Sequence, residues 1–451
     1  MNSRIWPLPL ALVLLALAWL WLQLPTVALL PGDEPLYLLI AQRWLDGNPL
    51  YDKLFLAHPP ARIVELAALL ALDVPAAWAK IVAPLATLAT AGLLAYALRE
   101  EIDRQTQLLI ATLFLLTPVV LGYGPLLVGV EQALACVALA TLLLLADRWL
   151  WAGILLSLGA QFALHVGVLV PPLLIWAWRD HRLVPLVQGL LLGLMPLALE
   201  LAWWGQPMLD QVFAYHFKKV SVMGAQHVPD RVLPFLKTHV VLILAAALGI
   251  FRGGVLGLRF ALAGLGALAL VLAWPRLQPY YFLLPIPWLV LAAALAWQDV
   301  PQRFARVALA LVLLASGLPT LLETWQRRPQ LQQADAEMKQ LSAQVLTLAQ
   351  ENHATLLWGD GALVPLLSLH TTLPIALEDT DLNAQRFQSG VTPPGPHLDA
   401  VLAQKPLLVV VPYHGLATVP VLRDRLLKET RQIGQFDARA ANFSGLLLLT
   451  R

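Results

Sequence analysis

The chain has 451 residues, of which 59% are hydrophobic and only 13% are charged. An ordinary soluble domain carries about 25% charged residues, so a water-soluble fold would lack a polar surface here and is excluded. The formal net charge is +2 and the basic residues are dispersed, which excludes a nucleic-acid patch. The single cysteine, Cys136, excludes a disulfide framework and a cysteine-rich metal site.

Long apolar runs dominate the first part of the chain. A helix of about 20 apolar residues crosses a bilayer, so these runs predict a polytopic α-helical membrane protein. The first run is too long for the apolar region of a signal peptide and has no Ala-x-Ala cleavage site, so we expect a retained signal anchor. About eleven transmembrane helices are expected, at residues 6–30, 78–98, 106–122, 126–146, 149–164, 166–178, 183–204, 237–251, 255–274, 279–297 and 303–322.

Arginines mark one side of the predicted helices. They occupy the N-terminus and the short connections between alternate spans, at Arg4, Arg99, Arg104, Arg148, Arg179, Arg182, Arg252, Arg259, Arg303 and Arg306. Short basic loops face the cytoplasm, so loops 31–77 and 205–236 and the tail are expected on the outer face. The short runs 149–164 and 166–178 are interpreted as a hairpin that turns at a wet His165. The alternative is that these two runs form one transmembrane span and one re-entrant segment.

After residue 322 the long apolar runs end, and amphipathic and short apolar patterns take their place. An apolar residue recurs at alternating three- and four-residue spacing from Leu331 to Leu348, which predicts an amphipathic helix. Short apolar runs at 354–358, 407–411 and 446–449 predict buried strands, and helical patterns lie at 383–389, 398–404 and 418–428. The sequence therefore predicts a transmembrane catalytic domain at 1–322 and a small extracytoplasmic α/β domain at 323–451. His370, His397 and His414 lack ligand spacing and are expected at its surface.

Two adjacent carboxylates follow the first span, within the stretch Gly32-Asp33-Glu34-Pro35-Leu36-Tyr37. A charge pair at the rim of a membrane is costly, so a functional role is favoured over a solvated helix cap. The segment from Pro35 to Leu45 carries an apolar face, which suits a helix lying in the interface. Such a helix would hold Asp33 at the depth of lipid headgroups.

The ionisable residues gather on one predicted face, whereas the centres of the spans are nearly free of charge. An ion-driven transporter would place such groups near the midplane. A carboxylate on this face can act as a general base, and Lys and Arg can bind a phosphate leaving group. This combination fits sugar transfer from a polyprenyl-phosphate donor at the membrane surface.

The first outer loop resembles that of the GT-C glycosyltransferases. The resemblance rests on Asp33-Glu34, Tyr37, the stretch Gly47-Asn48-Pro49-Leu50-Tyr51-Asp52 and His58-Pro59-Pro60. The relatives are the bacterial branch allied to protein O-mannosyltransferases and the lipid A aminoarabinose transferase. The resemblance implies that Asp33 is the base that activates the acceptor and that Glu34 is its orienter or substitute. It also implies that His58, where the family has Lys, binds the donor phosphate.

Other expected site residues are assigned less directly. Relatives often carry a further acid on the second outer loop, and this chain offers only Glu131, slightly inside the next span. Arg276 with Tyr280-Tyr281 before Pro285 loosely resembles a later family feature. The expected catalytic residues are Asp33 and Glu34; the expected substrate-binding residues are Tyr37, Lys53, His58, Glu131, His216, Lys218, Lys219, Arg276, Tyr280 and Tyr281.

Structural roles are open for some of these residues. Lys218 and Lys219 would equally contact anionic lipid headgroups, and Tyr280 and Tyr281 would equally belong to an interfacial aromatic belt. No cofactor is required by a clear ligand set. A divalent metal held by Asp33, Glu34, His58 and His216 is the one alternative.

The sequence therefore predicts a glycosyltransferase in a bacterial inner membrane, with the N-terminus cytoplasmic. It would move a sugar from a polyprenyl-phosphate donor to a glycan, lipid or protein acceptor, and a single displacement predicts inversion. The main alternative is a transporter or flippase of lipid-linked glycans. A structural assembly subunit, or a ligase that uses a pyrophosphate donor, are further alternatives.

Overall fold

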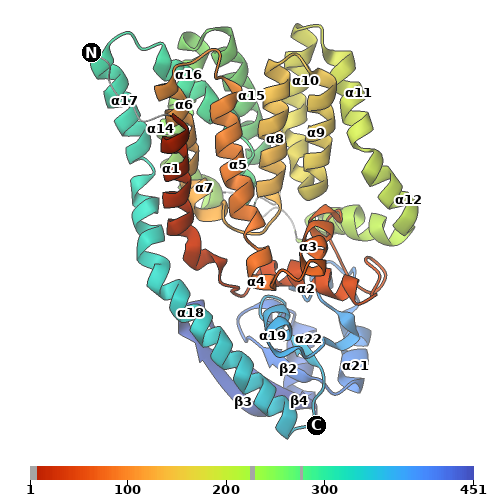
Figure 1. The fold of residues 1–451 in the computed structure, drawn as a ribbon. Helices are drawn as coiled ribbons and strands as arrows, with labels where there is room; N and C mark the ends of the chain where they lie inside the picture. The colour runs from red at the N-terminus through yellow and green to blue at the C-terminus, as the bar shows by residue number, and fades with distance from the viewer. Residues whose placement is uncertain (1–7, 224–228, 275–277, 451) are drawn as a thin grey trace. The chain divides into compact units, whose positions relative to one another are not determined.

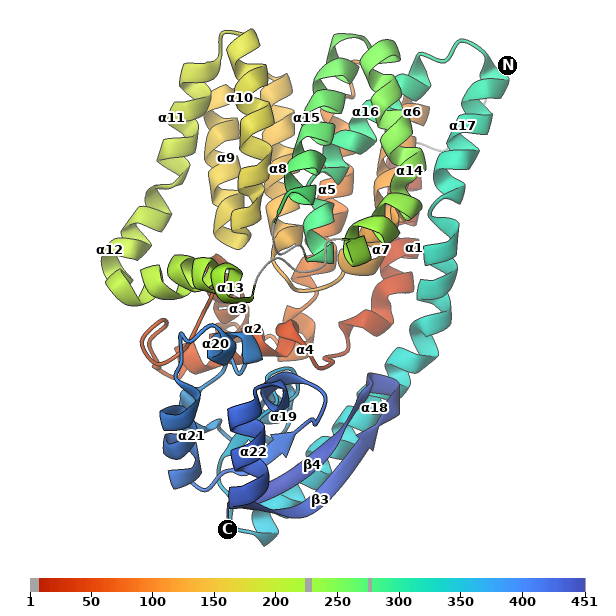
Figure 2. The ribbon, with the colours of Figure 1, turned by 180° about the vertical axis from the view of Figure 1, so that it is seen from behind.

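The computed structural model describes residues 8–223, 229–274 and 278–450, which form two compact units (Figures 1 and 2). One is a helical unit, built from the described parts of residues 8–24, 81–199 and 229–326. The other gathers three distant segments, 25–80, 200–223 and 327–450, and is called the composite unit below.

The helical unit consists of apolar helices that run side by side (Figure 2). They are α1 (Leu8–Gln23), α5 (Val82–Ala97), α6 (Arg104–Leu116), α7 (Pro118–Tyr123), α8 (Val130–Leu145), α9 (Trp149–Phe162), η2 (Leu164–Leu169), α10 (Val170–Arg179), α11 (Leu183–Gly193), α14 (Pro229–Arg252), α15 (Gly254–Leu272), η4 (Pro279–Leu283), α16 (Ile286–Gln298) and α17 (Arg303–Ala315). Helices α12 (Met195–Leu209) and α18 (Leu318–Glu351) start in this unit.

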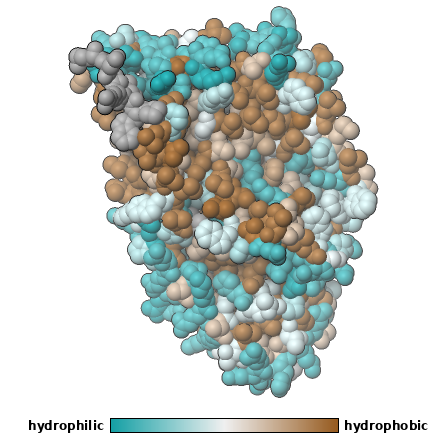
Figure 3. Space-filling view, viewed as in Figure 1, coloured by the Kyte–Doolittle hydropathy of each residue, from teal (hydrophilic) through white to brown (hydrophobic). Residues whose placement is uncertain are grey.

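Each predicted apolar run contains a helix, so the predicted polytopic helical class is confirmed. Among the described residues, six helical stretches are long and apolar enough to cross a membrane, and four apolar helices are shorter. The number of spans therefore stays a prediction. Figure 3 shows apolar side chains gathered over the helices of this unit, with hydrophilic side chains at one end of them. Exposed aromatic residues such as Phe251, at 81% exposure, suit contact with lipid.

Small residues and one central helix set the packing of the helical unit. Helices α9 and α11 approach so closely that a Cβ atom at Gly189 would lie 2.0 Å from the carbonyl O of Leu150. Such small-residue contacts let helix backbones pack tightly in a bilayer. Every residue of α16 from Ile286 to Trp297 is buried, and the indole of Trp288 donates to Thr141 Oγ1 on α8 at 3.0 Å.

The predicted break at His165 is present, but its environment differs from the expected one. Helix α9 ends at Phe162, and the short η2 leads into α10. The His165 ring stacks on the Tyr281 ring, with ring centroids 3.7 Å apart, and His165 is half-buried. His165 is therefore a partly exposed member of an aromatic stack at this turn.

The composite unit begins with the end of η1 (Leu24–Val27) and continues with α2 (Asp33–Leu45), α3 (Ala61–Ala71) and α4 (Ala76–Ala79). The end of α12, the π-helix η3 (Asp210–Ala214) and α13 (Tyr215–Met223) add to it. The predicted helix at 35–45 lies within α2. The residues of α2 from Glu34 to Ala41 are all buried. The first part of α2 therefore packs in the core of the unit, whereas the sequence predicted a helix with one apolar face lying in the interface.

The tail of the composite unit folds around a four-stranded sheet in the order β1-β2-β4-β3, with β1 parallel to β2 and the other pairs antiparallel. Its elements are β1 (Leu357–Gly359), α19 (Val364–Thr371), η5 (Ala376–Glu378), α20 (Ala384–Gln388), α21 (Pro394–Ala403), β2 (Leu407–Val410), η6 (Gly415–Thr418), α22 (Pro420–Glu429), β3 (Thr430–Ala438), η7 (Arg439–Ala441) and β4 (Phe443–Thr450). Buried Ala334, Met338, Leu341 and Val345 confirm the amphipathic pattern of α18.

The three predicted strands and three predicted helices of the tail are confirmed. Strand β3 and helix α19 were not predicted. Strand β3 carries polar residues at most positions and a bulge between Gln432 and Gly434, so its hydrophobic alternation is weak. Helix α19 is buried nearly all round and therefore has no amphipathic period to reveal it.

Candidate active site

Gly32 places Asp33 at the first position of α2. Its φ of 148° and ψ of −158° are readily adopted only by glycine, and its N–H donates to the carbonyl O of Ala362 at 3.0 Å. The cap of the helix is thus Gly32, and Asp33 lies in the first turn. A carboxylate there is favoured by the positive end of the helix dipole.

Two cations from other helices act on Asp33. The residue Asp33 is accessible to solvent, but many protein groups surround its carboxyl group and partly desolvate it. Burial raises the pKa of Asp33, and the charges of Arg62 on α3 and Lys219 on α13 oppose that rise. The guanidinium of Arg62 lies 4.2 Å over the ring of Tyr37, one turn along from Asp33. The result is a carboxyl group that is more basic than usual and still accessible.

Glu34 faces a different partner. Its Oε2 lies 2.7 Å from Nζ of Lys80, which is only 2% exposed and also donates to the carbonyl O of Ala28 at 3.1 Å. Consecutive helical residues point about 100° apart, so the two adjacent acids separate into different environments. Of the two expected roles of Glu34, this pairing favours orientation over substitution for Asp33.

Tyr37, His58 and His216 lie close together in the composite unit. The Tyr37 and His58 rings are 6.0 Å apart, and the His58 and His216 rings are 5.9 Å apart. The hydroxyl of Tyr51 donates to the carbonyl O of His58 at 2.7 Å, and His216 Nε2 lies 2.8 Å from the carbonyl O of Ala57. These bonds fix the loop that carries the paired prolines.

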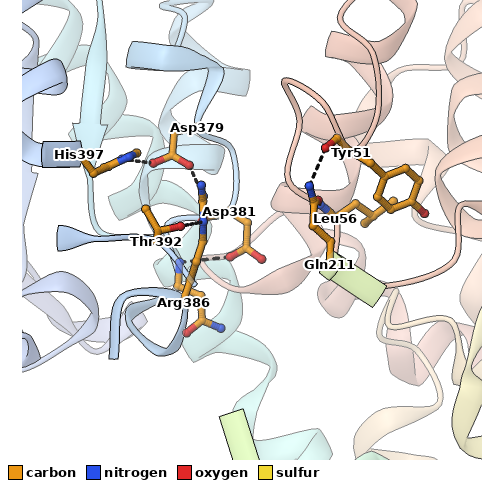
Figure 4. A network of polar contacts seen from close by, with 9 residues as sticks. Tyr51, Leu56, Gln211, Asp379, Asp381, Arg386, Thr392 and His397 are labelled. Carbon is orange, nitrogen blue, oxygen red and sulfur yellow. Dashed lines mark hydrogen bonds and ion pairs between the residues drawn. The ribbon is translucent and has the colours of Figure 1, made fainter. Parts of the chain in front are cut away.

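Gln211 of η3 joins the first loop to the segment that carries the expected lysines. Its amide N donates to the carbonyl O of Tyr51 at 2.6 Å, and its Oε1 accepts from the N–H of Leu56 at 2.8 Å (Figure 4). Lys219 follows on α13, with Nζ 5.4 Å from the centre of the Tyr215 ring. Lys53 and Lys218 are exposed side chains of the same unit.

The suggested metal site is not formed by these residues. Asp33, Glu34, His58 and His216 are all described, and across the described ranges no three His, Cys, Asp or Glu side chains gather as ligands. The Glu34 carboxylate forms an ion pair with Lys80, and His216 forms a hydrogen bond with the main-chain carbonyl of Ala57.

A polar network in the tail was missed from the sequence. The Arg386 guanidinium pairs with Asp379 and donates from Nε to Thr392 Oγ1 at 2.7 Å, and Nε2 of His397 lies 2.7 Å from Asp379 Oδ2 (Figure 4). His397 is therefore enclosed, which corrects its expected place at the surface. Burial alone would raise the pKa of Asp379, but Arg386 and His397 hold it below its ordinary value. The acidic run 378–381, followed closely by Arg386, was the available signal.

The remaining expected residues belong to the helical unit or lie outside the described residues. Glu131 is fully buried in the first turn of α8, two residues after Gly129, whose φ is 82°. Tyr280 and Tyr281 form η4, where Tyr280 lies 6.5 Å from Tyr123 between ring centres. Arg276 lies outside the described residues.

Solved structures show the same fold. ArnT from Cupriavidus metallidurans bound to undecaprenyl phosphate matches with a TM-score of 0.69 and 13% identity, over 98% of this chain and 97% of that one. The same protein in the apo state matches with a TM-score of 0.63 and 14% identity, over 97% of each chain. The chain has a GT-C fold. No protein-family model and no curated protein sequence matches it.

The fold that the resemblance of the first outer loop implied is confirmed. At 13% and 14% identity the likeness concerns the fold, and roles for individual residues need their own argument.

Proposed function

We propose that this chain is an integral membrane glycosyltransferase that moves a sugar from a polyprenyl-phosphate donor to an acceptor, with Asp33 as general base. The observation that carries the proposal is an accessible carboxyl group at the start of α2, on which the charges of Arg62 and Lys219 act, within a GT-C fold. A base needs such accessibility, because it must reach the proton that it removes.

The donor class is inferred from the fold and from the charges near Asp33. The ArnT structure of the same fold holds undecaprenyl phosphate, a polyprenyl phosphate. In this chain His58, His216, Lys218, Lys219 and Lys53 lie in the same unit as Asp33. Cationic and hydrogen-bonding groups of this kind stabilise the negative charge on a leaving phosphate.

The reaction balances without a further co-reactant. Asp33 accepts the proton of an acceptor hydroxyl or amine as that atom attacks the anomeric carbon. The bond from this carbon to the phosphate oxygen breaks, and the polyprenyl phosphate leaves with both electrons of that bond. One displacement inverts the configuration at the anomeric carbon. Glu34, held by Lys80, would fix the start of α2 while the proton moves.

The membrane arrangement forms part of the proposal. We assign residues 1–322 to a transmembrane catalytic domain and residues 323–451 to an extracytoplasmic domain, in the inner membrane and with the N-terminus in the cytoplasm. Glu131, Tyr280 and Tyr281 are proposed to bind substrate, as is Arg276. The exposed apolar side chains of the helical unit support a bilayer setting.

The test combines a strain that lacks the protein with the purified chain. Mass spectrometry of the strain should show one lipid-linked sugar accumulating and one envelope glycan losing a residue. Purified protein in lipid nanodiscs, supplied with that lipid-linked sugar and acceptor, should release polyprenyl phosphate and form a product of inverted configuration. Retained configuration would contradict the single displacement. In sealed proteoliposomes, a donor that crosses the bilayer without cleavage would show the transporter or flippase alternative to be correct.

A further inference from the structure

The guanidinium of Arg386 on α20 is held in place by groups of the C-terminal tail. It forms an ion pair with Asp379, and its Nε donates to Thr392 Oγ1 at 2.7 Å (Figure 4). Its Nη1 also donates to the main-chain O of Asp381 at 3.1 Å. The side chain of Asp379 is 3% exposed and also lies 2.7 Å from Nε2 of His397. With these partners the planar guanidinium has a fixed orientation.

Phe55, in the loop between α2 and α3, packs against this fixed guanidinium. The Cζ atom of Arg386 lies 4.5 Å from the centre of the Phe55 ring. Phe55 is 6% exposed and forms a small buried cluster with Ala57 and Tyr215, against which Val391 also packs. The Phe55 and Tyr215 rings meet edge to face, with centroids 5.5 Å apart. A cation–π contact is stronger where water is excluded, so the contact with Arg386 helps to fix the Phe55 ring.

The cluster around Phe55 joins the two segments that carry the proposed phosphate-binding residues. His58 follows Phe55 by three residues in the loop, and its ring lies 5.9 Å from that of His216 on α13. Lys219 lies one turn after Tyr215 on α13, with Nζ 5.4 Å from the centre of the Tyr215 ring. The place of the loop against α13 therefore depends on where the Phe55 ring is held.

We propose that Arg386 is a positioning residue of the active site, which acts through Phe55 to hold the loop of His58 against α13 where the donor phosphate binds. This inference rests on the proposed function. Because the Phe55 ring contacts both Arg386 and Tyr215, its displacement would move His58 relative to Lys219. The C-terminal tail thereby contributes to donor binding without a substrate contact of its own.

The experiment measures how tightly the purified full chain in nanodiscs binds undecaprenyl phosphate, followed by native mass spectrometry. Phe55→Leu keeps apolar bulk and leaves the ion pair between Arg386 and Asp379 in place, but removes the aromatic face. Its Kd for undecaprenyl phosphate should rise about tenfold over wild type, the scale that one desolvated cation–π contact sets. A thermal midpoint measured on each variant shows that the variant is folded.

Sugar transfer with the lipid-linked donor is the second readout. The donor phosphate is charged before and after transfer, so groups that bind it act on the donor KM more than on kcat. In Phe55→Leu the donor KM should therefore rise about tenfold, while the acceptor KM and kcat change little. A merely structural role would instead lower the amount of active protein, and with it the apparent kcat, at an unchanged donor KM.

Matched variants test whether Arg386 acts through Phe55. Arg386→Lys keeps the charge but loses the flat guanidinium, so it should raise the Kd by a similar factor. The double variant should bind no more weakly than either single one, because both changes remove the same contact. Phe55→Tyr keeps a ring and should bind as wild type does. Phe436→Leu, at an equally buried phenylalanine of β3, should leave the Kd unchanged.

The outcomes separate this inference from the proposed function. An unchanged Kd in folded Phe55→Leu would overturn the inference, as would losses that add up in the double variant. A rise in kcat effects alone, with the donor KM of wild type, would overturn it as well. A wild-type chain that binds undecaprenyl phosphate and shows the expected shifts, but transfers no sugar, would overturn the proposed function and leave the positioning of the phosphate site intact.

Discussion

Two acidic centres of the composite unit contrast sharply, although each carboxylate lies near an arginine. Asp379 is 3% exposed at its side chain, and Arg386 and His397 both bind its oxygens directly. Its pKa is held below the ordinary value against the effect of burial. Asp33 is exposed, its cations Arg62 and Lys219 act through charge, and its pKa is raised.

The contrast teaches that proximity of a cation does not decide the role of an acid. Short hydrogen bonds to both oxygens of Asp379 stabilise the ionised form and leave little capacity for a substrate. Asp33 keeps its proton affinity and its access. We therefore propose a structural role for Asp379 and a catalytic role for Asp33. Substitution of Asp379 should then lower stability, whereas substitution of Asp33 should lower activity.

The largest expected effect is on activity at Asp33. Asp33→Asn should lower kcat by about 10²- to 10⁴-fold, the usual contribution of a general base, with an unchanged thermal midpoint. Steady-state transfer assays on purified protein measure this loss. Asp46→Asn, an exposed acid at the other end of α2, is the matched control and should keep full activity. Full activity of Asp33→Asn would end the contrast.

The next effect is on stability at Asp379. Asp379→Asn should destabilise the composite unit by about 3–5 kcal/mol, because it leaves the enclosed Arg386 charge without its carboxylate. Thermal unfolding in detergent measures the change. Asp399→Asn breaks an ion pair whose acid is 64% exposed and should cost less than about 1 kcal/mol. Equal midpoints for the two variants would show that the Asp379 network is dispensable.

A smaller effect concerns the pH dependence of stability at Asp381. Its pKa rises on folding from 3.8 to about 6, so the fold favours the protonated form, and this contribution disappears as pH rises through about 6. Asp381→Asn stays neutral and should be more stable than wild type above that pH, by at most about 3 kcal/mol. The difference between the two melting curves should vanish near pH 4. A constant difference across this range would refute the assignment.

The smallest expected effect is at His414. A hydrogen bond from its ring to Asp360 raises its pKa, so its contribution to stability is complete below the ordinary value and is lost as pH rises through the folded value. Because the His414 side chain is 50% exposed, the loss should be below about 1 kcal/mol. Melting points of His414→Asn and wild type should differ more in mild acid than in mild base.

Periodicity and local chemistry allowed much of the fold and part of the site to be predicted. Long apolar runs are typical of membrane-spanning helices, so the helices and their order could be predicted. Asp33 stood out because a carboxylate after a long apolar run is costly. The partners Arg62 and Lys80 could be seen as charges but not as partners, because pairing depends on which helices pack together. The Asp379 network was missed because Arg386 and His397 meet Asp379 only when the tail folds, which local spacing does not reveal.

The hydrogen bond between Gly32 and Ala362 has a consequence for biosynthesis. A ribosome delivers the first-loop acid long before it delivers the strand and helices that fix the turn at Gly32. The turn at Gly32 therefore lacks this hydrogen bond until Ala362 has been synthesised. If the proposed function holds, a chain shortened before Ala362 should lack this hydrogen bond and transfer sugar more slowly than the full chain.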